Sequence, residues 1–319
     1  MSNSGNPTFR IAFVGECMIE LQEDAQGVIH KGFAGDTLNT ALYMARLSYL
    51  HNAEVQYVTG LGLDSFSQAM IENWQSEGIA CDYIRRFENK LPGLYFVEVD
   101  EDGERSFQYW RGQAAARDLF SGSEFDKQLN EIAEFDYIYL SGISLAILPE
   151  EGKQRLVDWL NQSRANGAKV CFDNNYRPKL WANKQETQKW YSKVLQATDI
   201  ACHTFDDDQL IWGDTEPSQA FERLQGFGVS EIILKRGTEP CLIEIDGGVT
   251  QSIPAIKVAK ENLADTNAAG DSFSAGYLSA RLAGQAPAES AAIAHRVAST
   301  VVQHRGAIIP RDVMPKIEL

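Results

Sequence analysis

The 319-residue sequence has no uninterrupted apolar run of 18 residues, and its first ten residues, MSNSGNPTFR, contain no apolar core. A membrane-spanning helix needs about 20 consecutive apolar residues, and a secretory signal needs an apolar segment of roughly 7–15 residues near the N-terminus. We therefore expect a chain without membrane spans that resides in the cytoplasm. Residues 1–8 are expected to form a loose tail.

Disulfide and metal-binding cysteine patterns are also missing. The five cysteines are an odd number, they are scattered along the chain, and none belongs to a C-x-x-C pair. Secreted domains that depend on disulfides carry an even, closely spaced set. The interpretation that fits this sequence is a set of reduced thiols in the cytoplasm.

The sequence has no excess of positive charge. It contains 29 Lys and Arg against 44 Asp and Glu, which gives a net charge of −15. Such a chain repels nucleic acid and anionic membranes, so we expect neither as a partner. A small anionic substrate is not excluded, because a few arginines placed locally can override the overall field. The content of 44% hydrophobic and 23% charged residues is typical of a globular protein.

Short apolar runs alternate with segments of helical spacing, and the chain has no internal repeat or long linker. This alternation predicts an α/β protein with a mainly parallel sheet that helices cover on both faces. We expect residues 1–319 to form one domain. The expected strands are 11–14, 55–59, 137–140, 170–172, 200–202 and 232–234, and the expected helices are 38–50, 66–77, 150–166, 184–196, 218–226, 272–283 and 288–304.

Two segments break the alternation. Residues 16–33 hold a short apolar stretch followed by a turn at 24–27, and residues 94–110 have the pattern of a hairpin with its turn at 100–103. A small β unit built from about 16–33 and 91–111 could act as a lid over a site. An ordinary surface excursion is an equal alternative for the hairpin.

The segment with the clearest chemical meaning is 265–276, which reads DTNAAGDSFSAG. Asp271 follows Gly270 just inside a predicted helix start, and the small residues Ala268, Ala269 and Gly270 leave backbone N–H groups uncovered. Such a helix end binds anions. A carboxylate beside it can take a proton from an alcohol while the N–H groups stabilise a transferring phosphoryl group. The alternative is an ordinary helix start with a favourable acidic residue.

Two polar segments could hold a sugar. In the first, Gly35 lets the backbone approach a ligand, and Asp36 and Asn39 offer polar groups; the alternative is a glycine turn with an Asp cap. The second follows the strand at 170–172, where ligands bind in open parallel sheets. Its polar residues Asp173, Asn175 and Arg177 are expected to face the crevice; the alternative is a loop stabilised by its own Arg–Asp pair.

The expected hairpin carries aromatic residues and an arginine. Tyr95 lies on its first strand, and Tyr109, Trp110 and Arg111 end its second strand. An aromatic platform with a guanidinium suits a sugar acid, because the ring stacks and the guanidinium binds the carboxylate in a fork. Packing of these aromatics on the core is an equal alternative for Tyr109 and Trp110.

A second group of residues suits a nucleotide. Lys235, Gly237 and Thr238 follow the strand at 232–234 and could cradle a phosphate, although Lys235 could equally be a solvated strand-end charge. The run at 206–208 is three aspartates, a composition that also suits the first turn of a helix. His295 lies in the last long helix, where a histidine on its own is more often a packing residue.

The segment 265–276 resembles the C-terminal signature of the ribokinase-like (PfkB) carbohydrate kinases, whose usual form is Asp-Thr-Thr-Gly-Ala-Gly-Asp. This chain departs from it at Asn267 and Ala268. Alanine adopts positive φ at a higher cost than glycine does, so the cost of Ala268 depends on the backbone there. The resemblance implies that Asp271 is the catalytic base and that the N–H groups of residues 268–270 form the anion hole.

The resemblance spans nearly the whole chain and is strongest to the branch that acts on 2-keto-3-deoxygluconate, through segments 15–21, 35–39, 91–95, 173–177 and 268–271. It implies a three-layer αβα sandwich with a small β lid, and ATP- and Mg²⁺-dependent phosphorylation of that sugar acid at its 6-hydroxyl. Thr204 and Asp207 match the family's Asn-x-x-Glu, which implies a water-mediated Mg²⁺ role for Asp207. His295 falls where the family contacts adenine.

The same resemblance implies a homodimer or higher homo-oligomer, since lid hairpins of this family often pair between subunits. Two other functions stay open at this point. The substrate could be a neutral sugar, as in kinases of the fructokinase or ribokinase type. The chain could also be a sugar-acid-binding homologue without catalysis, which the intact Asp271 argues against.

Overall fold

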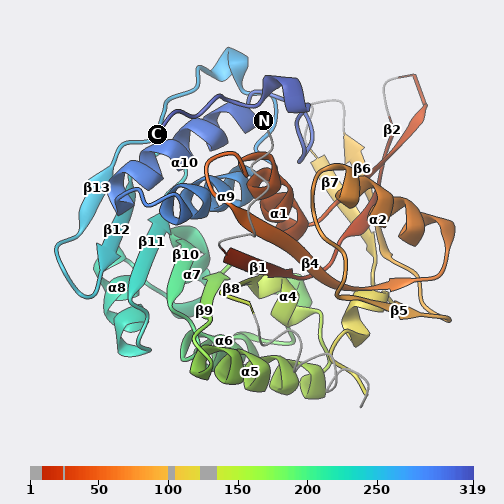
Figure 1. The fold of residues 1–319 in the computed structure, drawn as a ribbon, viewed down its shortest axis with the longest axis horizontal. Coiled ribbons are helices and arrows are strands. Elements are labelled where there is room, and N and C mark those ends of the chain that lie inside the picture. Colours follow the sequence, from red (N-terminus) through yellow and green to blue (C-terminus); the bar gives the residue numbers. More distant parts are fainter. Residues whose placement is uncertain (1–8, 24–25, 100–104, 123–134) are drawn as a thin grey trace.

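The computed structural model describes residues 9–23, 26–99, 105–122 and 135–319. The expected tail at 1–8 and the expected turn at 100–103 lie outside these ranges. The elements form three layers, with a large sheet between two groups of helices and a second, smaller sheet at one side (Figure 1). Within the described residues, no helix is both long enough and apolar enough to cross a membrane.

The large sheet has the strand order β13-β12-β11-β10-β9-β8-β1-β4-β5. All neighbours from β11 to β5 are parallel, whereas β12 and β13 add an antiparallel edge. The central strands are buried on both faces, which is why they appear in the sequence as short apolar runs. The bounds are β1 (Phe9–Val14), β4 (Ala53–Gly62), β5 (Ile84–Phe87), β8 (Tyr137–Ser141), β9 (Lys169–Asp173), β10 (Ile200–Thr204), β11 (Glu231–Lys235), β12 (Cys241–Ile245) and β13 (Gln251–Ile253).

Helices cover both faces of this sheet, as the alternating pattern predicts. One hydrophobic cluster joins the sheet to α1 (Asp36–Arg46), α2 (Ser65–Ser76), α9 (Ala269–Leu282) and α10 (Pro287–Val301). The cluster on the other face joins it to α4 (Gly142–Ala146), α5 (Glu150–Ala165), α6 (Lys184–Leu195), α7 (Phe205–Trp212) and α8 (Pro217–Gly226). Four 3₁₀ turns complete the described elements: η1 (Ala115–Asp118), η2 (Pro178–Leu180), η3 (Lys260–Asn262) and η4 (Arg311–Val313).

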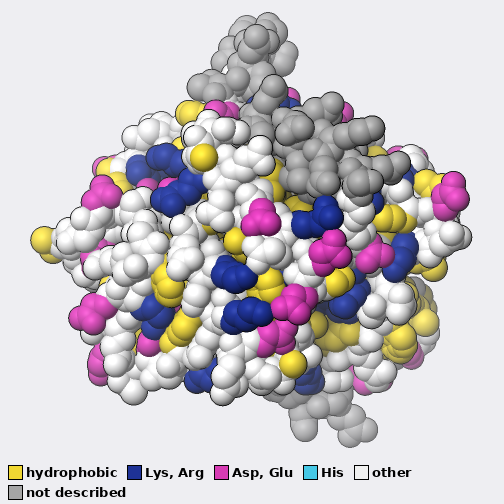
Figure 2. All heavy atoms as spheres, turned by 90° about the horizontal axis from the view of Figure 1, so that it is seen from below, with side chains coloured by type: hydrophobic (Ala, Val, Ile, Leu, Met, Phe, Trp, Pro, Cys, Tyr) yellow, Lys and Arg dark blue, Asp and Glu magenta, His cyan; other side chains and the backbone are white. Residues whose placement is uncertain are grey.

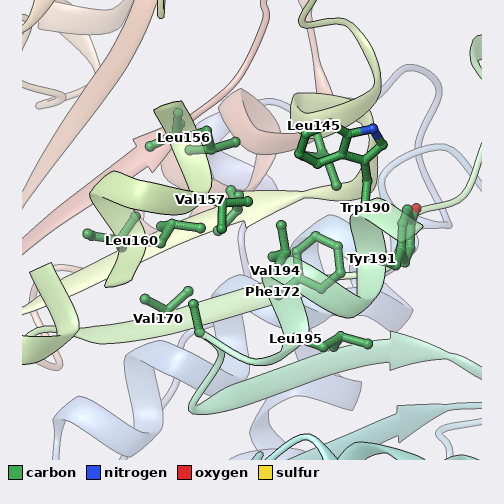
Figure 3. Close-up of a cluster of buried hydrophobic side chains, with 14 of the residues drawn as sticks. Leu145, Leu156, Val157, Leu160, Val170, Phe172, Trp190, Tyr191, Val194 and Leu195 are labelled. Atoms are coloured by element: carbon green, nitrogen blue, oxygen red, sulfur yellow. The ribbon is translucent and has the colours of Figure 1, made fainter. Parts of the chain in front are cut away.

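The second cluster shows how spacing in the sequence produces the packing. Leu156 and Leu160, one helical turn apart on α5, lie with Val170 and Phe172 of β9 (Figure 3). Fully burying side chains of this kind stabilises a fold by about 1.5–3 kcal/mol each. On the outer surface on the α5 side, positive and negative side chains are interspersed (Figure 2). Such a mixed charged surface is typical of a face exposed to solvent.

The small sheet is the β unit predicted from about 16–33 and 91–111; it is called the lid sheet, or lid, below, and its action as a lid stays a prediction. It consists of β2 (Met18–Glu23), β3 (Ile29–Ala34), β6 (Gly93–Val99) and β7 (Arg105–Trp110), in the order β3-β2-β6-β7. The predicted hairpin is confirmed by the antiparallel pairing of β6 with β7. The segment from the N-terminal region joins it through parallel pairing of β2 with β6. The lid is therefore one sheet made from two distant parts of the chain.

Candidate active site

Several of the predicted site residues meet at the carboxyl ends of the central parallel strands. β9 ends at Asp173 and β11 ends at Lys235, and the amino ends of α1 and α9 lie beside them. Hydrogen bonds tie these elements together, including Asn39 Nδ2 to Asp271 Oδ2 at 2.8 Å and Lys235 Nζ to Asp173 Oδ2 at 2.6 Å. This is the edge at which open parallel sheets bind ligands.

Asp271 lies in the first turn of α9. Burial, together with the nearby charge of Asp36, raises the pKa of its carboxyl to about 7, although the hydrogen bond from Asn39 and the charge of Lys235 oppose the rise. A carboxyl with a pKa near neutrality can accept a proton and release it again at physiological pH. The electrostatic surroundings of Asp271 are therefore those of a general base.

The backbone in front of Asp271 forms an open helix end. The N–H groups of Gly270 and Asp271 have no acceptor within the described residues, whereas that of Ala269 lies 3.3 Å from the carbonyl oxygen of Thr266. The N–H group of Ala268 likewise has no acceptor there, so these three donors and the positive end of a 14-residue helix remain available to an anion. Of the three residues predicted to offer N–H groups, Ala268 and Gly270 have them free, and Asp271 adds another.

Ala268, just before the helix, adopts φ +57° in the left-handed region. The family signature has glycine here, and the structure shows why: a side chain in this conformation costs about 1–2 kcal/mol. Alanine would cost little here only if the backbone had a negative φ, and it does not. The chain thus holds a strained residue directly before the open end of α9.

Asp173 and Lys235 form a buried ion pair beneath the start of α9. Their exposed fractions are 3% and 8%, and Asp173 Oδ2 also accepts hydrogen bonds from Tyr139 and Ser274. Burial alone would lower the pKa of Lys235, but the charge of Asp173 leaves it raised. A side chain added at Gly270 would lie 3.4 Å from Lys235 Nζ, so the ammonium group sits directly under the open helix end.

The first predicted sugar segment and the β9 loop face each other. Asn175 Nδ2 donates to Asp36 Oδ2 at 2.7 Å, and Asn175 itself has a positive φ of 23°. Burial raises the pKa of Asp36, and hydrogen bonds from Ser141 and the Thr37 backbone oppose that rise. Gly35 allows close packing, because a side chain there would collide with the Glu16 carbonyl.

Arg177 is exposed and forms no ion pair with a described residue. Its Nη1 donates only to the carbonyl oxygen of Tyr176, at 3.0 Å. Asp173, the acidic residue of the same loop, is paired with Lys235 instead. The alternative of a loop stabilised by its own Arg–Asp pair is therefore wrong, and the guanidinium of Arg177 is available to a ligand.

The lid contributes aromatic residues of two kinds. Tyr95 is 7% exposed and its hydroxyl donates to Glu20, whereas Tyr109 and Trp110 are 51% and 59% exposed. The Tyr109 ring lies 5.8 Å from that of Tyr95. Arg111 forms an ion pair with the buried Glu16. The exposed rings are thus not core residues, and the platform interpretation stays a prediction.

The residues expected to bind the nucleotide differ in exposure to solvent. Gly237 and Thr238 lie in an exposed turn after β11. Asp207 Oδ2 accepts from the Tyr176 backbone at 3.0 Å, and burial raises the pKa of its carboxyl to about 6. His295 packs edge-on against a phenylalanine ring; burial lowers its pKa, and its Nε2 is buried without a hydrogen-bond partner.

Thr204 is the N-cap residue of α7 and makes no side-chain capping bond; its N–H donates to Asn174 Oδ1 and its carbonyl oxygen accepts from Asn174 Nδ2, each at 2.8 Å. Asn174 joins β9 to β10 in this way and was not among the predicted site residues. Its signal in the sequence is only its place in a polar run. Within the described chain, no cluster of three or more His, Cys, Asp or Glu side chains could hold a metal ion. A divalent cation here would need waters and phosphate oxygens beside Asp207, which is the usual arrangement for Mg²⁺.

Comparison with known proteins gives a consistent result. Residues 8–314 match the family described as pfkB family carbohydrate kinase. The chain is similar to the 2-dehydro-3-deoxygluconokinase of Dickeya dadantii (strain 3937), with 52% identity over 97% of this chain and 99% of that protein. It is similar to the protein of the same name from Escherichia coli (strain K12), with 50% identity over 96% and 99%.

Among solved structures, a ribokinase-type protein from E. coli in complex with ATP and Mg²⁺ has a TM-score of 0.81 to this chain. The two sequences are 21% identical, and the match covers 94% of each chain. At this level of identity the likeness shows a shared fold.

Proposed function

The chain belongs to the pfkB family of carbohydrate kinases and has their ribokinase-like fold, and from that premise we propose that it phosphorylates 2-keto-3-deoxy-D-gluconate. This compound is the 2-dehydro-3-deoxygluconate in the names of the two relatives. The reaction transfers the γ-phosphoryl group of ATP to the 6-hydroxyl and gives 2-keto-3-deoxy-6-phosphogluconate. The enzyme is thus a phosphotransferase with an alcohol as acceptor.

The observation that carries the proposal is the position of Asp271 among the free N–H groups at the start of α9. Asp271 accepts the proton of the 6-hydroxyl as its oxygen attacks the γ-phosphorus. The free N–H groups of Ala268, Gly270 and Asp271 donate to the phosphoryl oxygens, whose charge is stabilised where it develops. Asn39 holds the carboxylate of Asp271 in place through its 2.8 Å hydrogen bond.

The sugar acid is bound between the β9 loop and the lid. Arg177 and Arg111 bind its carboxylate and keto end, because guanidinium groups match a carboxylate with two parallel donors. Asp36 and Asn175, which already contact each other, accept and donate hydrogen bonds to the hydroxyls. Tyr95 and Tyr109 form the wall on the lid side.

ATP binds along the edge of β10 and β11. Gly237 and Thr238 contact its phosphates from their exposed turn, and Lys235 lies beneath the anion hole. His295 fits a place against the adenine, because its Nε2 is buried without a protein partner. Mg²⁺ neutralises the phosphate charge when it is bound, and Asp207 would hold it through water. Asp207→Ala should raise the Mg²⁺ concentration needed for half-maximal turnover; an unchanged requirement would limit Asp207 to a helix start.

The remaining proposals concern organisation. We treat residues 1–319 as one domain with the lid inserted in it, and we expect the lid sheet to close over the bound sugar and exclude water. The exposed rings of Tyr109 and Trp110 on this sheet favour a homodimer in which two lids cover each other's edges. The five cysteines carry no disulfide, which suits the ATP-containing and reducing cytoplasm.

An assay of ADP release with a panel of acceptors tests the function. The panel contains 2-keto-3-deoxygluconate, its neutral analogue without the carboxylate, fructose and a ribonucleoside, each with and without Mg²⁺. We expect turnover only with Mg²⁺ and a kcat/KM for the sugar acid at least about tenfold above that for any neutral sugar. Equal use of fructose would refute the substrate, and no phosphorylation of any acceptor would refute the kinase.

A further inference from the structure

Glu16 is a buried acidic residue at the junction of the large sheet and the lid. It follows the end of β1 and precedes the start of β2, and only 2% of its surface is exposed. A carboxylate in such a place is costly unless a partner neutralises it. Burial raises the pKa of the Glu16 carboxyl, the charges of Arg111 and Arg117 oppose that rise, and the charge of Asp36 adds to it.

The partner of Glu16 comes from the lid. Glu16 Oε2 accepts a hydrogen bond from Nη2 of Arg111, the residue directly after β7. The exposed fractions of the two side chains are 1% and 11%, so the ion pair is shielded from water. A side chain at Gly93, the first residue of β6, would come within 2.6 Å of Glu16 Oε1. The pair therefore connects the end of β1 with both strands of the lid hairpin.

This ion pair uses only part of the Arg111 guanidinium. Nε of Arg111 is buried without a partner, and Nη1 forms no hydrogen bond within the described residues. Oε1 of Glu16 is likewise buried without a partner. One edge of the guanidinium is thus fixed by the protein, its carbon lies 5.9 Å from the centre of the Tyr109 ring, and its remaining donors have no acceptor among the described residues.

Fixing one edge of a planar guanidinium sets the direction of the others. An arginine on a lid strand would otherwise adopt many side-chain conformations, and ordering it on binding costs about 0.5–1.5 kcal/mol. Glu16 removes this cost before the substrate arrives. It also leaves Arg111 and Glu16 together neutral, which gives the exposed Arg177 the larger share of the attraction for an anion.

We propose that Glu16 is a positioning residue for sugar-acid recognition, which orients the guanidinium of Arg111 so that its free donors meet the polar end of the substrate. The proposal rests on the function proposed above. Glu16 itself does not touch the reacting atoms. Its removal should therefore affect substrate binding and leave the phosphoryl-transfer step largely unchanged.

The test is a double-mutant cycle of Glu16→Gln and Arg111→Met in the full-length protein, measured by steady-state kinetics. Gln keeps the shape of Glu16 and removes its charge. We expect Glu16→Gln to raise KM for 2-keto-3-deoxygluconate by about tenfold, with kcat within about threefold and KM for ATP unchanged. In the Arg111→Met background the same change should alter KM by less than about twofold, because the group through which Glu16 acts is gone.

Glu231→Gln is the matched control. Glu231 is 9% exposed and is the first residue of β11, at the end of that strand opposite to Lys235. It forms an ion pair with Arg281 at 2.8 Å. Its variant should lower the melting temperature as Glu16→Gln does, with no change in KM. If Glu16→Gln behaves like this control, or if it lowers KM because a freed Arg111 binds the substrate more tightly, the positioning role is refuted. Equal effects with and without Arg111 refute it as well.

Kinetics of the wild type distinguish a wrong substrate assignment from a wrong role for Glu16. A wild type that uses a neutral analogue as well as the sugar acid refutes the substrate assignment and the role of Glu16 together. A wild type that requires the carboxylate, combined with an unchanged KM in Glu16→Gln, refutes the role of Glu16 alone.

Discussion

Replacing Asp271 by Asn should lower turnover strongly and, above neutral pH, stabilise the folded protein. Both effects have one cause, because the burial that prepares the carboxyl to accept a proton also makes its charged form costly. Asn keeps the shape and can still accept the hydrogen bond from Asn39, but it has no charge. We expect kcat to fall by about 10²-fold or more, since a positioned general base contributes roughly that factor.

The size of the stability effect follows from the pKa. It rises from the ordinary value of 3.8 in the unfolded chain to about 7 in the folded protein, and one unit of pKa difference corresponds to about 1.4 kcal/mol. Below pH 3.8 the carboxyl is protonated in both the folded and the unfolded state, so its burial as a charge does not reduce the free energy of unfolding. As pH rises from 3.8 to 7 the unfolded chain loses its proton first and stability falls. Above pH 7 the cost is complete, with an upper limit of about 4 kcal/mol.

Denaturant unfolding of wild type and Asp271→Asn at pH 4 and pH 8 measures this difference. At pH 8 we expect the variant to be more stable by about 1–4 kcal/mol, and at pH 4 the two proteins should be nearly equal. A gain of the same size at both pH values would mean that the effect is not electrostatic. Turnover near the wild-type level in the folded variant would remove Asp271 from the role of base.

Three further substitutions test other parts of the site. Ala268→Gly should relieve the left-handed backbone at φ +57° and raise the free energy of unfolding by about 0.5–1 kcal/mol with kcat unchanged; a loss of stability would contradict the strain. Asn39→Ala removes a hydrogen bond that lowers the pKa of Asp271, so the acidic limb of the kcat/KM profile, expected near pH 7, should move up by about one pH unit. A limb that stays in place would show that another group limits the rate. Arg177→Lys should lower kcat/KM for the sugar acid by roughly 10- to 150-fold and leave KM for ATP nearly unchanged; an unchanged ratio of sugar acid to neutral analogue would exclude it as the carboxylate ligand.

The main features of the fold follow from the sequence because they depend on burial. Strands covered on both faces must be apolar, so β9 and β10 are visible as short apolar runs. The strands at the edges are different. β5 reads Ile-Arg-Arg-Phe and β13 is three half-exposed or exposed residues, and neither pattern is distinct from a loop. The pairing of β2 with β6 is also invisible locally, because nothing in either strand indicates a distant partner.

In the site, too, some features could be predicted from the sequence and others could not. Asp271, Asn39 and the β9 loop could be located because helix starts and strand ends gather at one edge of a parallel sheet. Which charges pair there could not be predicted. Lys235 is tied to Asp173 beneath the helix end, and Arg111 is tied to Glu16. Both are contacts between side chains more than 60 positions apart, set by packing of the whole chain.

The two-part origin of the lid has a consequence for the order of folding. Glu20 of β2 contacts Tyr95 of β6 across 75 positions of sequence, and the chain between them forms β3, α1, β4, α2 and β5. Closing a flexible loop of that length costs about 4 kcal/mol of chain entropy, more than a few lid contacts return. We expect the large sheet to assemble first and to bring β2 and β6 together, because non-local pairing is slow until the intervening chain is ordered. The cover of the active site would then be the last part to fold, and it could open while the rest of the protein stays intact.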